Sequence, residues 1–274
     1  MHLLLCGHGY LGQAISRDFL AAGWDVTPLS RSGDDVSLAC DLSSKADVAA
    51  LTTKPDFIVH CASSGRGGVD AYQAVYFDGC RHLLDRFPRV PLLFTSSTSV
   101  YAQTDGSEVT EESPAEPDRE TGKILRHTED LVLANGGLIT RLSGIYGPGR
   151  SVILKKFLGG EAVIEEDGRR FLNQIHRDDA AAAILHLAGI PGTGGNLFNL
   201  TDSTPLTQLE CYEKLSSLFH LPLPPSGPRD PNRKRGWTHK RVSNAKLRAT
   251  GWEPRFASFL DAAPRIAGTL TTSE

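Results

Sequence analysis

The sequence predicts an α/β fold in which helices cover both faces of a doubly wound parallel sheet. Short apolar runs alternate with segments that have the period of helices, which is typical of such a sheet. The first run, 1–6, leads directly into three glycines at G-x-G-x-x-G spacing, Gly7, Gly9 and Gly12. A strand, a glycine turn and a helix in this order indicate a Rossmann-type nucleotide-binding fold.

Each of the three glycines has its own physical role. Gly7 allows a tight turn, Gly9 lets the backbone approach a pyrophosphate, and Gly12 lets helix and strand pack closely. Residues 13–22 have the period of a helix, with Leu11 on its apolar side. Free N–H groups at the helix start would hold the phosphates, so Tyr10 and Leu11 are also expected to contact the dinucleotide. We therefore expect these residues to bind a dinucleotide, and a plain tight turn is the alternative.

Composition argues against several other classes of protein. The chain has 274 residues, 40% of them hydrophobic, enough to bury one large domain or two intergrown ones. A net charge of -3 gives no basic field for nucleic acid. No apolar run approaches the ~20 residues that span a bilayer, and no signal peptide is evident. Five scattered cysteines without a C-x-x-C pair indicate reduced core thiols, a cytoplasmic protein and no metal site.

The second predicted strand, 24–29, bears on the choice between the two nicotinamide dinucleotides. NAD-binding folds use a carboxylate after this strand for the ribose 2′-hydroxyl, whereas an arginine accommodates the 2′-phosphate of NADP. Here Ser30 and Arg31 follow the strand, and no carboxylate comes before Asp34. The sequence favours NADP over NAD, and a solvated surface arginine is the alternative. Pro28 indicates that the end of this strand is not a central position of the sheet.

Three further strands are predicted at 36–40, 56–61 and 91–95, with a helix over about 70–87 before the last of them. Ligands of an open parallel sheet bind outside the carboxyl ends of its strands, where the strand order reverses. Small residues after the strand 56–61 leave room there for a cofactor. The residues at these ends that we expect to contact the cofactor are Asp41, Leu42, Cys61, Ala62 and Ser63.

Further motifs follow in one order along nearly the whole chain. They are 94–101 (FTSSTSVY), 141–149 (RLSGIYGPG), 175–180 (IHRDDA), 243–247 (SNAKL) and 251–254 (GWEP). Together with the N-terminal glycines, they make the chain resemble the extended short-chain dehydrogenases/reductases, the NAD(P)-dependent epimerase/dehydratase group. The resemblance adds Leu142, at the end of a sixth strand over 138–142, to the expected cofactor contacts.

The resemblance also implies two intergrown domains. A dinucleotide-binding domain would comprise about 1–147, with 176–200 returning to it. A smaller C-terminal substrate-binding domain would comprise 148–175 and 201–274. Within the second domain we expect a hairpin-like piece over 159–171 and an amphipathic helix over 208–219.

The family implies a catalytic Ser or Thr, a Tyr and a Lys. Ser97 has the position of the catalytic hydroxyl, and the Tyr-x-x-x-Lys motif should open the helix 121–134. Counting back from Glu129, which has the family's position four residues after the Lys, places Leu125 at the Lys and Thr121 at the Tyr. Both reacting groups are therefore missing. This break resembles the atypical YeeZ-like branch, which keeps the fold and loses the pair.

Another group would then have to supply the proton. A tyrosine works as an acid or base at neutral pH because nearby positive charges lower its pKa, and Thr or Leu cannot replace it. Lys123 lies about 200° around the helix from the expected Lys. We expect Ser97 and Tyr101 to be the catalytic groups, with Tyr146 and His127 as weaker candidates. A structural role is the alternative for each of them.

One basic run, 228–241, lies in the C-terminal part. Because the arginine fork binds two oxygens of a phosphate or carboxylate, Arg229 or Arg233 is a candidate to face a nucleotide diphosphate sugar. A solvated loop is the usual alternative for such a run. No aromatic residues interleave it in the pattern of nucleic-acid binders, so no nucleic-acid partner is expected.

The sequence thus supports two functions of different classes. The first is an NADP-preferring oxidoreductase or epimerase-like enzyme that acts on a small substrate, nucleotide-linked or phosphorylated. The second is a catalytically inactive NADP-binding sensor or scaffold. The missing Tyr/Lys pair favours the second, and Ser97 with the strand-end motifs favours the first. By resemblance, a homodimer would form through helices near 70–87 and 121–134, and no membrane partner is expected.

Overall fold

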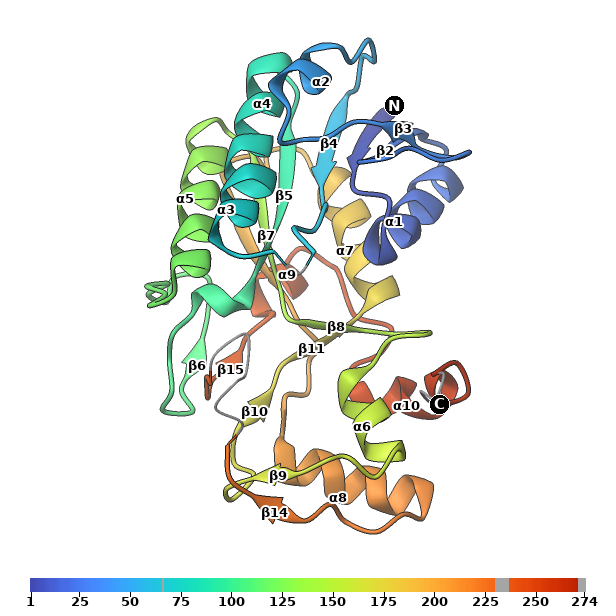
Figure 1. Ribbon diagram of the computed structural model, residues 1–274, viewed down its shortest axis with the longest axis vertical. Coiled ribbons are helices and arrows are strands. Elements are labelled where there is room, and N and C mark those ends of the chain that lie inside the picture. The colour runs from blue at the N-terminus through green and yellow to red at the C-terminus, as the bar shows by residue number, and fades with distance from the viewer. Residues whose placement is uncertain (66, 230–236, 271–274) are drawn as a thin grey trace. The chain divides into compact units, whose positions relative to one another are not determined.

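The structure, a computed structural model, describes residues 1–65, 67–229 and 237–270. The chain divides into two compact units (Figure 1). The first unit comprises Met1–Tyr101, Pro114–Leu142 and Ala180–Phe198. The second comprises Ala102–Ser113, Ser143–Asp179 and the chain from Asn199 onward. Both units are therefore assembled from segments that are distant in the sequence.

The first unit is built on a seven-stranded sheet of order β12-β7-β5-β4-β1-β2-β3 among the described residues. The strands are β1 His2–Cys6, β2 Asp25–Ser30, β3 Leu38–Ala39, β4 Phe57–His60, β5 Leu92–Ser97, β7 Leu138–Leu142 and β12 Leu197–Leu200. The pairs from β3 through β7 are all parallel. The chain winds from β1 toward β3, then crosses to β4 on the other side of β1. The predicted doubly wound parallel fold is confirmed.

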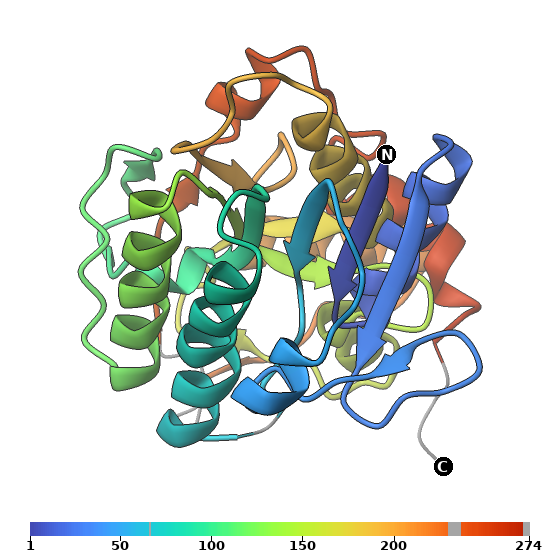
Figure 2. The same cartoon turned by 90° about the horizontal axis from the view of Figure 1, so that it is seen from above.

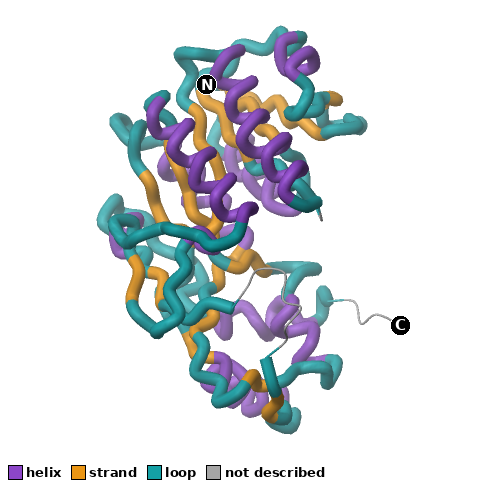
Figure 3. The backbone as a smooth tube through the Cα atoms, turned by 60° about the vertical axis from the view of Figure 1, so that its left-hand side comes forward, coloured by secondary structure: helices purple, strands orange, loops and turns teal. Residues whose placement is uncertain are grey.

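Helices cover both faces of this sheet, as Figure 2 shows. The helices α1 Tyr10–Ala21 and α7 Arg177–Ala188 lie on one face, and the longer helix α5 Glu120–Ala134 lies on the other. Beside α5 runs one continuous helical segment made of α3 Val69–Tyr72, the π-helical turn η1 Gln73–Asp78 and α4 Gly79–Arg86 (Figure 3). A short helix, α2 Lys45–Ala49, follows β3.

The edge of the sheet at β2 and β3 differs from the prediction. The strand continues past Pro28, and Leu29 pairs with Cys6 on one side and Leu38 on the other. The expectation drawn from Pro28 is therefore wrong. Because β3 is only two residues long and begins opposite Leu29, the proline needs no partner on that side.

The second unit contains short paired strands and helices. Its strands are β6 Glu108–Val109, β8 Gly144–Tyr146, β9 Ile164–Glu165, β10 Phe171–Leu172, β11 Gln174–His176, β13 Leu206–Thr207, β14 Ser226–Gly227 and β15 Arg241–Val242. Its helices are α6 Val152–Leu158, α8 Gln208–Phe219, α9 Ala245–Arg248 and α10 Phe259–Ala267. The strands pair as β8 with β11, β9 with β14, β10 with β13 and β6 with β15.

The predicted hairpin over 159–171 is wrong, whereas the predicted helix 208–219 is confirmed as α8. A turn does form near Gly168, whose N–H donates to the carbonyl of Glu165. The two strands beside this turn nevertheless pair with different partners, β14 and β13. The helix is well marked locally, because Thr207 and Glu210 form a capping box at its N-terminus.

His60, at the end of β4, is fully buried against the π-helical turn. Its Nε2 lies 2.9 Å from the carbonyl oxygen of Val75. A carbonyl only accepts hydrogen bonds, so Nε2 carries the proton. Burial lowers the pKa of His60 to about 4, so the ring is neutral at pH 7. This hydrogen bond connects the central sheet to the segment that runs beside α5.

We expect His60→Gln to flatten the pH dependence of stability. Unfolded histidine binds a proton below about pH 6.5, whereas folded His60 binds one only near pH 4, so its contribution is present above pH 6.5 and lost as the pH falls. The loss amounts to at most about 3 kcal/mol. Urea unfolding at several pH values between 4 and 7 measures it, with the exposed His127→Gln as control. Equal slopes for the wild type and His60→Gln would contradict this assignment.

Candidate functional site

The glycine turn after β1 packs backbone against backbone. The N–H groups of Gly7 and His8 both donate to the carbonyl of Leu29, at 3.0 and 3.1 Å. A Cβ added at Gly7, where φ is 108°, would lie 2.4 Å from the nitrogen of Ala62. A Cβ added at Gly12 would lie 1.9 Å from the carbonyl oxygen of Gly7. Larger residues cannot occupy either position without moving the backbone.

Gly9 lies in a different environment, because a Cβ added there would have no heavy atom within 4 Å. It is the N-cap of α1, which begins at Tyr10, three residues before the predicted segment 13–22, and its residue type provides no side chain to cap the helix. The first turn of α1 also carries no acidic residue. Open space beside uncapped N–H groups at a helix N-terminus fits the pyrophosphate of a dinucleotide.

The end of β4 lies directly against the glycine turn. The N–H of Cys61 donates to the carbonyl of Cys6 at 2.9 Å, and its Sγ donates to the carbonyl of Gly7 at 3.2 Å. Burial raises the pKa of Cys61 to about 12, which keeps the thiol protonated as a donor. Ser63 follows, and its Oγ accepts from the N–H of Gly65 at 3.1 Å. The predicted cofactor residues 7, 12, 61 and 62 are therefore brought together.

The side chain of Asp34 holds the loop after β2 together by hydrogen bonds within the loop. Asp34 Oδ1 accepts from the N–H groups of Val36 and Ser37, at 2.9 and 2.6 Å, and from the hydroxyl of Ser37 at 2.8 Å. These hydrogen bonds, that of the Ser37 side chain above all, lower the pKa of Asp34. Ser30 Oγ lies 2.7 Å from Ser37 Oγ. Arg31 is exposed, and no described residue forms an ion pair with it.

Two other predicted contacts follow β3, and one ends β7. Asp41 Oδ1 accepts from the backbone and side chain of Ser43, at 2.9 and 2.7 Å. Leu42 is buried, and its carbonyl lies 3.0 Å from Nδ1 of His82. Leu142 is buried and pairs with the end of β5. Their contacts with a cofactor remain predictions.

The two candidate catalytic residues differ strongly in exposure. Ser97, the last residue of β5, is half-buried, and its Oγ accepts from the N–H of Ser99 at 3.2 Å. The hydroxyl proton of Ser97 is therefore left to donate elsewhere. Tyr101 is 0% exposed, with the guanidinium carbon of Arg141 4.7 Å from its ring centroid. This burial favours Ser97 over Tyr101 as the group that meets a substrate.

The remaining tyrosine and histidine candidates lie in very different surroundings. Tyr146, in the second unit, is buried between His176 and Phe259, and burial raises the pKa of Tyr146. His127 is exposed on α5. A buried phenol with a raised pKa is a poor acid at neutral pH.

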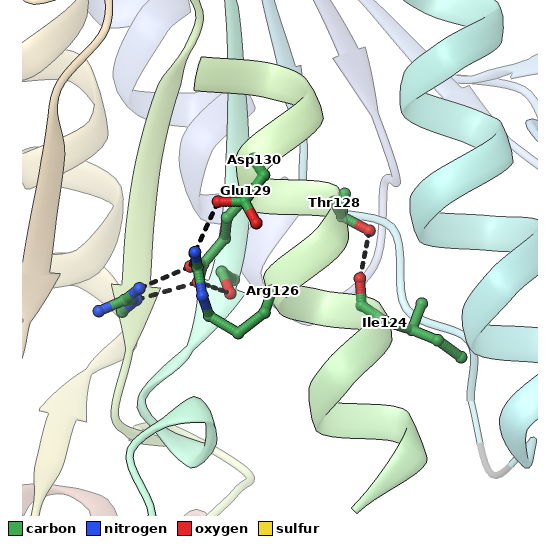
Figure 4. Close-up of polar contacts among 7 residues, drawn as sticks. Ile124, Arg126, Thr128, Glu129 and Asp130 are labelled. Carbon is green, nitrogen blue, oxygen red and sulfur yellow. Dashed lines mark hydrogen bonds and ion pairs between the residues drawn. The ribbon is translucent and has the colours of Figure 1, made fainter. Parts of the chain in front are cut away.

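A buried carboxylate fixes the helix on which the Tyr/Lys pair was expected (Figure 4). Glu129 is 0% exposed and accepts from Ser96 Oγ at 2.5 Å. Arg141 donates to both of its oxygens, at 3.0 and 2.6 Å, and Arg126 donates to one of them. Arg126 also bonds Asp130. Removing one partner of such a buried pair typically costs about 3–5 kcal/mol, so this network holds α5 against β5 and β7.

The positions of the missing pair hold no replacement on α5. Thr121 is half-buried in the first turn, and Leu125 is buried. Lys123 is exposed and forms an ion pair with Glu120 at 2.7 Å. The lysine therefore does not compensate for the loss, as the helical geometry predicted.

Sequence reasoning overlooked Tyr76, which lies in η1 beside α5. Its hydroxyl accepts from the N–H of Ser64 at 3.1 Å, just beyond the end of β4. Its ring contacts His60 and Phe94, with centroids 6.3 and 5.8 Å away. The signal in the sequence was a tyrosine on the helix 70–87, the helix that follows the strand of a predicted cofactor contact.

The basic run 228–241 gives less support for an anion site than the sequence suggested. Arg229 donates to both carboxylate oxygens of Glu166, at 2.6 and 2.8 Å, and its guanidinium carbon lies 3.7 Å from the ring centroid of Trp237. An arginine engaged in this way has less of its fork available to an anion. Arg233 lies outside the described residues.

Two classes of site find no support in the part of the chain that the structure describes. No group of three or more His, Cys, Asp or Glu side chains there is arranged to hold a metal ion. No helix there combines the length and apolar character that a membrane span requires.

The comparison with protein families identifies the chain. The model of the NAD dependent epimerase/dehydratase family matches residues 3–200. The chain belongs to this family. The resemblance drawn from the motifs is thereby confirmed, and a nicotinamide dinucleotide, NAD or NADP, is the cofactor that belongs with it. The open space at Gly9 beside the uncapped helix fits that group. No curated protein sequence matches the chain.

Solved structures of similar fold cover nearly the whole chain. The structure of a protein from Methylobacillus flagellatus that is assigned as a NAD-dependent epimerase/dehydratase is 27% identical over 97% of each chain, with a TM-score of 0.81. The human epimerase family protein SDR39U1 with NADPH is 18% identical over 98% of this chain and 100% of that one, with a TM-score of 0.83. UDP-glucose 4-epimerase of Thermotoga maritima with UDP-glucose is 17% identical over 98% of each, with a TM-score of 0.80.

We expect Gly9→Ala to weaken dinucleotide binding at least about tenfold, because the added methyl fills the space that the pyrophosphate needs. Calorimetry with NADP and NAD measures the loss.

Gly68→Ala is a matched control for this variant. Gly68 is the N-cap of α3 with nearly the same backbone angles, φ −86° and ψ −151° against −90° and −153°, and also has open space around its Cβ. Both variants replace an N-cap glycine by alanine and should lose similar stability, at most about 1 kcal/mol. Equal dinucleotide affinities for the two variants would place the pyrophosphate elsewhere.

Proposed function

We propose that the protein is an NADP-preferring oxidoreductase or sugar-nucleotide-modifying enzyme with an atypical active site. The observation that carries this proposal is the shared edge of the sheet in the first unit. The open space at Gly9 follows β1, the predicted contacts 61–63 follow β4, and Ser97 ends β5. These three strands are neighbours in the order β5-β4-β1. A cofactor bound along the glycine turn would thus extend toward a hydroxyl suited to a substrate oxygen.

The preference for NADP is supported by the loop after β2. The carboxylate of Asp34 is bound by its own loop, so a carboxylate for a ribose 2′-hydroxyl is not presented there. Arg31 is exposed and has no ion pair with a described residue, so its fork is available to a 2′-phosphate. SDR39U1, similar in fold, holds NADPH.

The substrate we propose is small and nucleotide-linked or phosphorylated. Support comes from the Thermotoga epimerase, which holds UDP-glucose. We assign cofactor binding to the unit that contains the seven-stranded sheet and substrate binding to the second unit.

The residues of this chain would divide the work as follows. Bound NAD(P) supplies or accepts a hydride. Ser97 would donate its hydroxyl proton in a hydrogen bond to the reacting oxygen, because its oxygen accepts from the N–H of Ser99 and its proton is left to donate. The buried network of Glu129 holds Ser96, and with it the end of β5, in place. Rigid support of this kind is what positions a catalytic hydroxyl.

The second candidate is an NADP-binding sensor or scaffold without turnover. The observation that favours it is the environment of Thr121 and Leu125, neither of which supplies a proton or a charge. The two candidates share cofactor binding and differ only in chemistry, so turnover separates them.

We expect Arg31→Ala to lower the affinity for NADPH about tenfold or more while leaving that for NADH nearly unchanged, because only NADPH carries the 2′-phosphate. Calorimetry with both dinucleotides gives the ratio of affinities. Arg81→Ala, which removes an exposed arginine of α4, is the control. If the ratio is the same in Arg31→Ala and Arg81→Ala, the assignment of the 2′-phosphate to Arg31 fails.

We expect the nicotinamide fluorescence of bound NADPH to decay when sugar nucleotides are added. Ser97→Ala should slow this decay about 100-fold, because the transition state loses one positioned hydrogen bond. Ser99→Ala keeps the backbone N–H that Ser97 accepts from and serves as the control. Tight NADPH binding with no decay across a broad panel would favour the sensor instead.

A further inference from the structure

We infer that Tyr76, on the π-helical turn beside α5, is the catalytic acid/base that replaces the missing Tyr/Lys pair. This inference rests on the proposed function, because a proton-transfer group has a role only where turnover occurs. It assigns a catalytic residue that neither the family motif nor the spacing on α5 points to.

The hydroxyl of Tyr76 lies at the carboxyl edge of the sheet. It accepts from the N–H of Ser64 at 3.1 Å. Ser64 directly follows the predicted cofactor contacts Cys61, Ala62 and Ser63 at the end of β4. A side chain that reaches this loop reaches the edge where dinucleotides bind in open parallel sheets.

Tyr76 and Ser97 belong to the same part of that edge. The strands β4 and β5 pair in parallel, with His60 opposite Phe94, and the ring of Tyr76 packs on both of these residues. Ser97 lies three residues beyond Phe94, and Ser64 lies four residues beyond His60. Because neighbouring strands are only about 4.8 Å apart, the loop after β4 and the last three residues of β5 start out side by side from the pair of His60 and Phe94.

The phenol of Tyr76 has a proton to give. Its oxygen accepts from Ser64, and no described residue accepts its own proton. The ring is half-buried, in contrast to the fully buried Tyr101 and Tyr146. Tyr76 therefore combines position, access and a proton that no described residue accepts, whereas Tyr101 and Tyr146 lack the access.

The π-helical turn explains how the side chain reaches the edge. A π turn shifts the helix by one residue relative to an α-helix and often lies at functional sites. Its Val75 carbonyl accepts from His60, which is neutral at pH 7 because burial lowers the pKa of His60 to about 4. His60 therefore adds no positive charge beside Tyr76, and the charge of an oxidised nicotinamide would be the one that stabilises its phenolate.

The proton transfer balances as a reduction of a carbonyl. The carbonyl carbon gains a hydride from a reduced nicotinamide dinucleotide, and the carbonyl oxygen gains the proton as the O–H bond of Tyr76 breaks. The tyrosinate then regains a proton from water. In the reverse direction the tyrosinate takes the proton of the substrate alcohol as the carbon loses a hydride. Ser97 holds the same oxygen by a hydrogen bond in both directions.

The ionisation of Tyr76, measured by NMR, tests this inference. The protein contains six tyrosines, and 13C at their Cζ atoms reports whether each phenol is ionised. Tyr76→Phe identifies the resonance of interest. Tyr72→Phe, which removes the hydroxyl of the ring 4.9 Å away on the same helical segment, is the matched control and must retain it.

We expect saturation with NADP+ to lower the pH midpoint of this resonance by about one unit or more, because a positive charge within a few ångströms favours the phenolate.

Binding of NADP+ without a change in that midpoint would overturn the inference and leave the proposed cofactor intact. Absence of NADP+ binding in the wild type would instead overturn the proposed function, and the inference with it. Should Tyr76→Phe not fold, the wild-type resonance is assigned by elimination, with phenylalanine placed in turn at each of the other five tyrosines, Tyr10, Tyr72, Tyr101, Tyr146 and Tyr212, and the same comparison decides.

Discussion

The close approach of the glycine turn to the end of β4 is the constraint on which the first unit depends. Gly7 and Ala62 are so close that a single Cβ at Gly7 would lie 2.4 Å from a backbone nitrogen. The Sγ of Cys61 adds a hydrogen bond across the same contact. This contact and that of Gly12 with the carbonyl of Gly7 hold the start of α1 close to β1 and β4, while Gly9 between them leaves the helix start uncapped and the space beside it open.

A second constraint is the charge of Glu129, buried at 0% exposure. A carboxylate shielded from water needs an opposite charge beside it and hydrogen bonds to its oxygens. Arg141 on β7 supplies the charge and two hydrogen bonds, and Ser96 on β5 supplies another hydrogen bond. The consequence for function is indirect. Ser96 precedes Ser97, so the residue that satisfies the buried charge also determines where the candidate catalytic hydroxyl lies.

Much of the first unit could be predicted because its signals are local. The strand of apolar residues before Gly7 and the helix after it need no knowledge of distant partners. The pairings of β9 and β10 could not be predicted, because short strands pair wherever the tertiary structure offers an edge, and here the edges come from residues 206–207 and 226–227. The partners of Glu129 could not be predicted either, because they come from strands that are distant in the sequence, whereas its position on the helix could.

Tyr76 illustrates the limit for a catalytic site. A motif search asks which residue type follows a fixed spacing on one helix, and on α5 it finds Thr121 and Leu125. The chemistry asks only that a hydroxyl lie near the reacting oxygen with a charge that stabilises its phenolate, whichever helix carries it.

Retention of Glu129 is weak evidence of turnover, because a buried ion pair is costly to break whether or not the site is active. The phenol of Tyr76 is different, because it is only half-buried and no described residue accepts its proton, so it can donate to a ligand at this edge. That difference favours an enzyme whose proton donor lies on the neighbouring helix over a scaffold that has lost one.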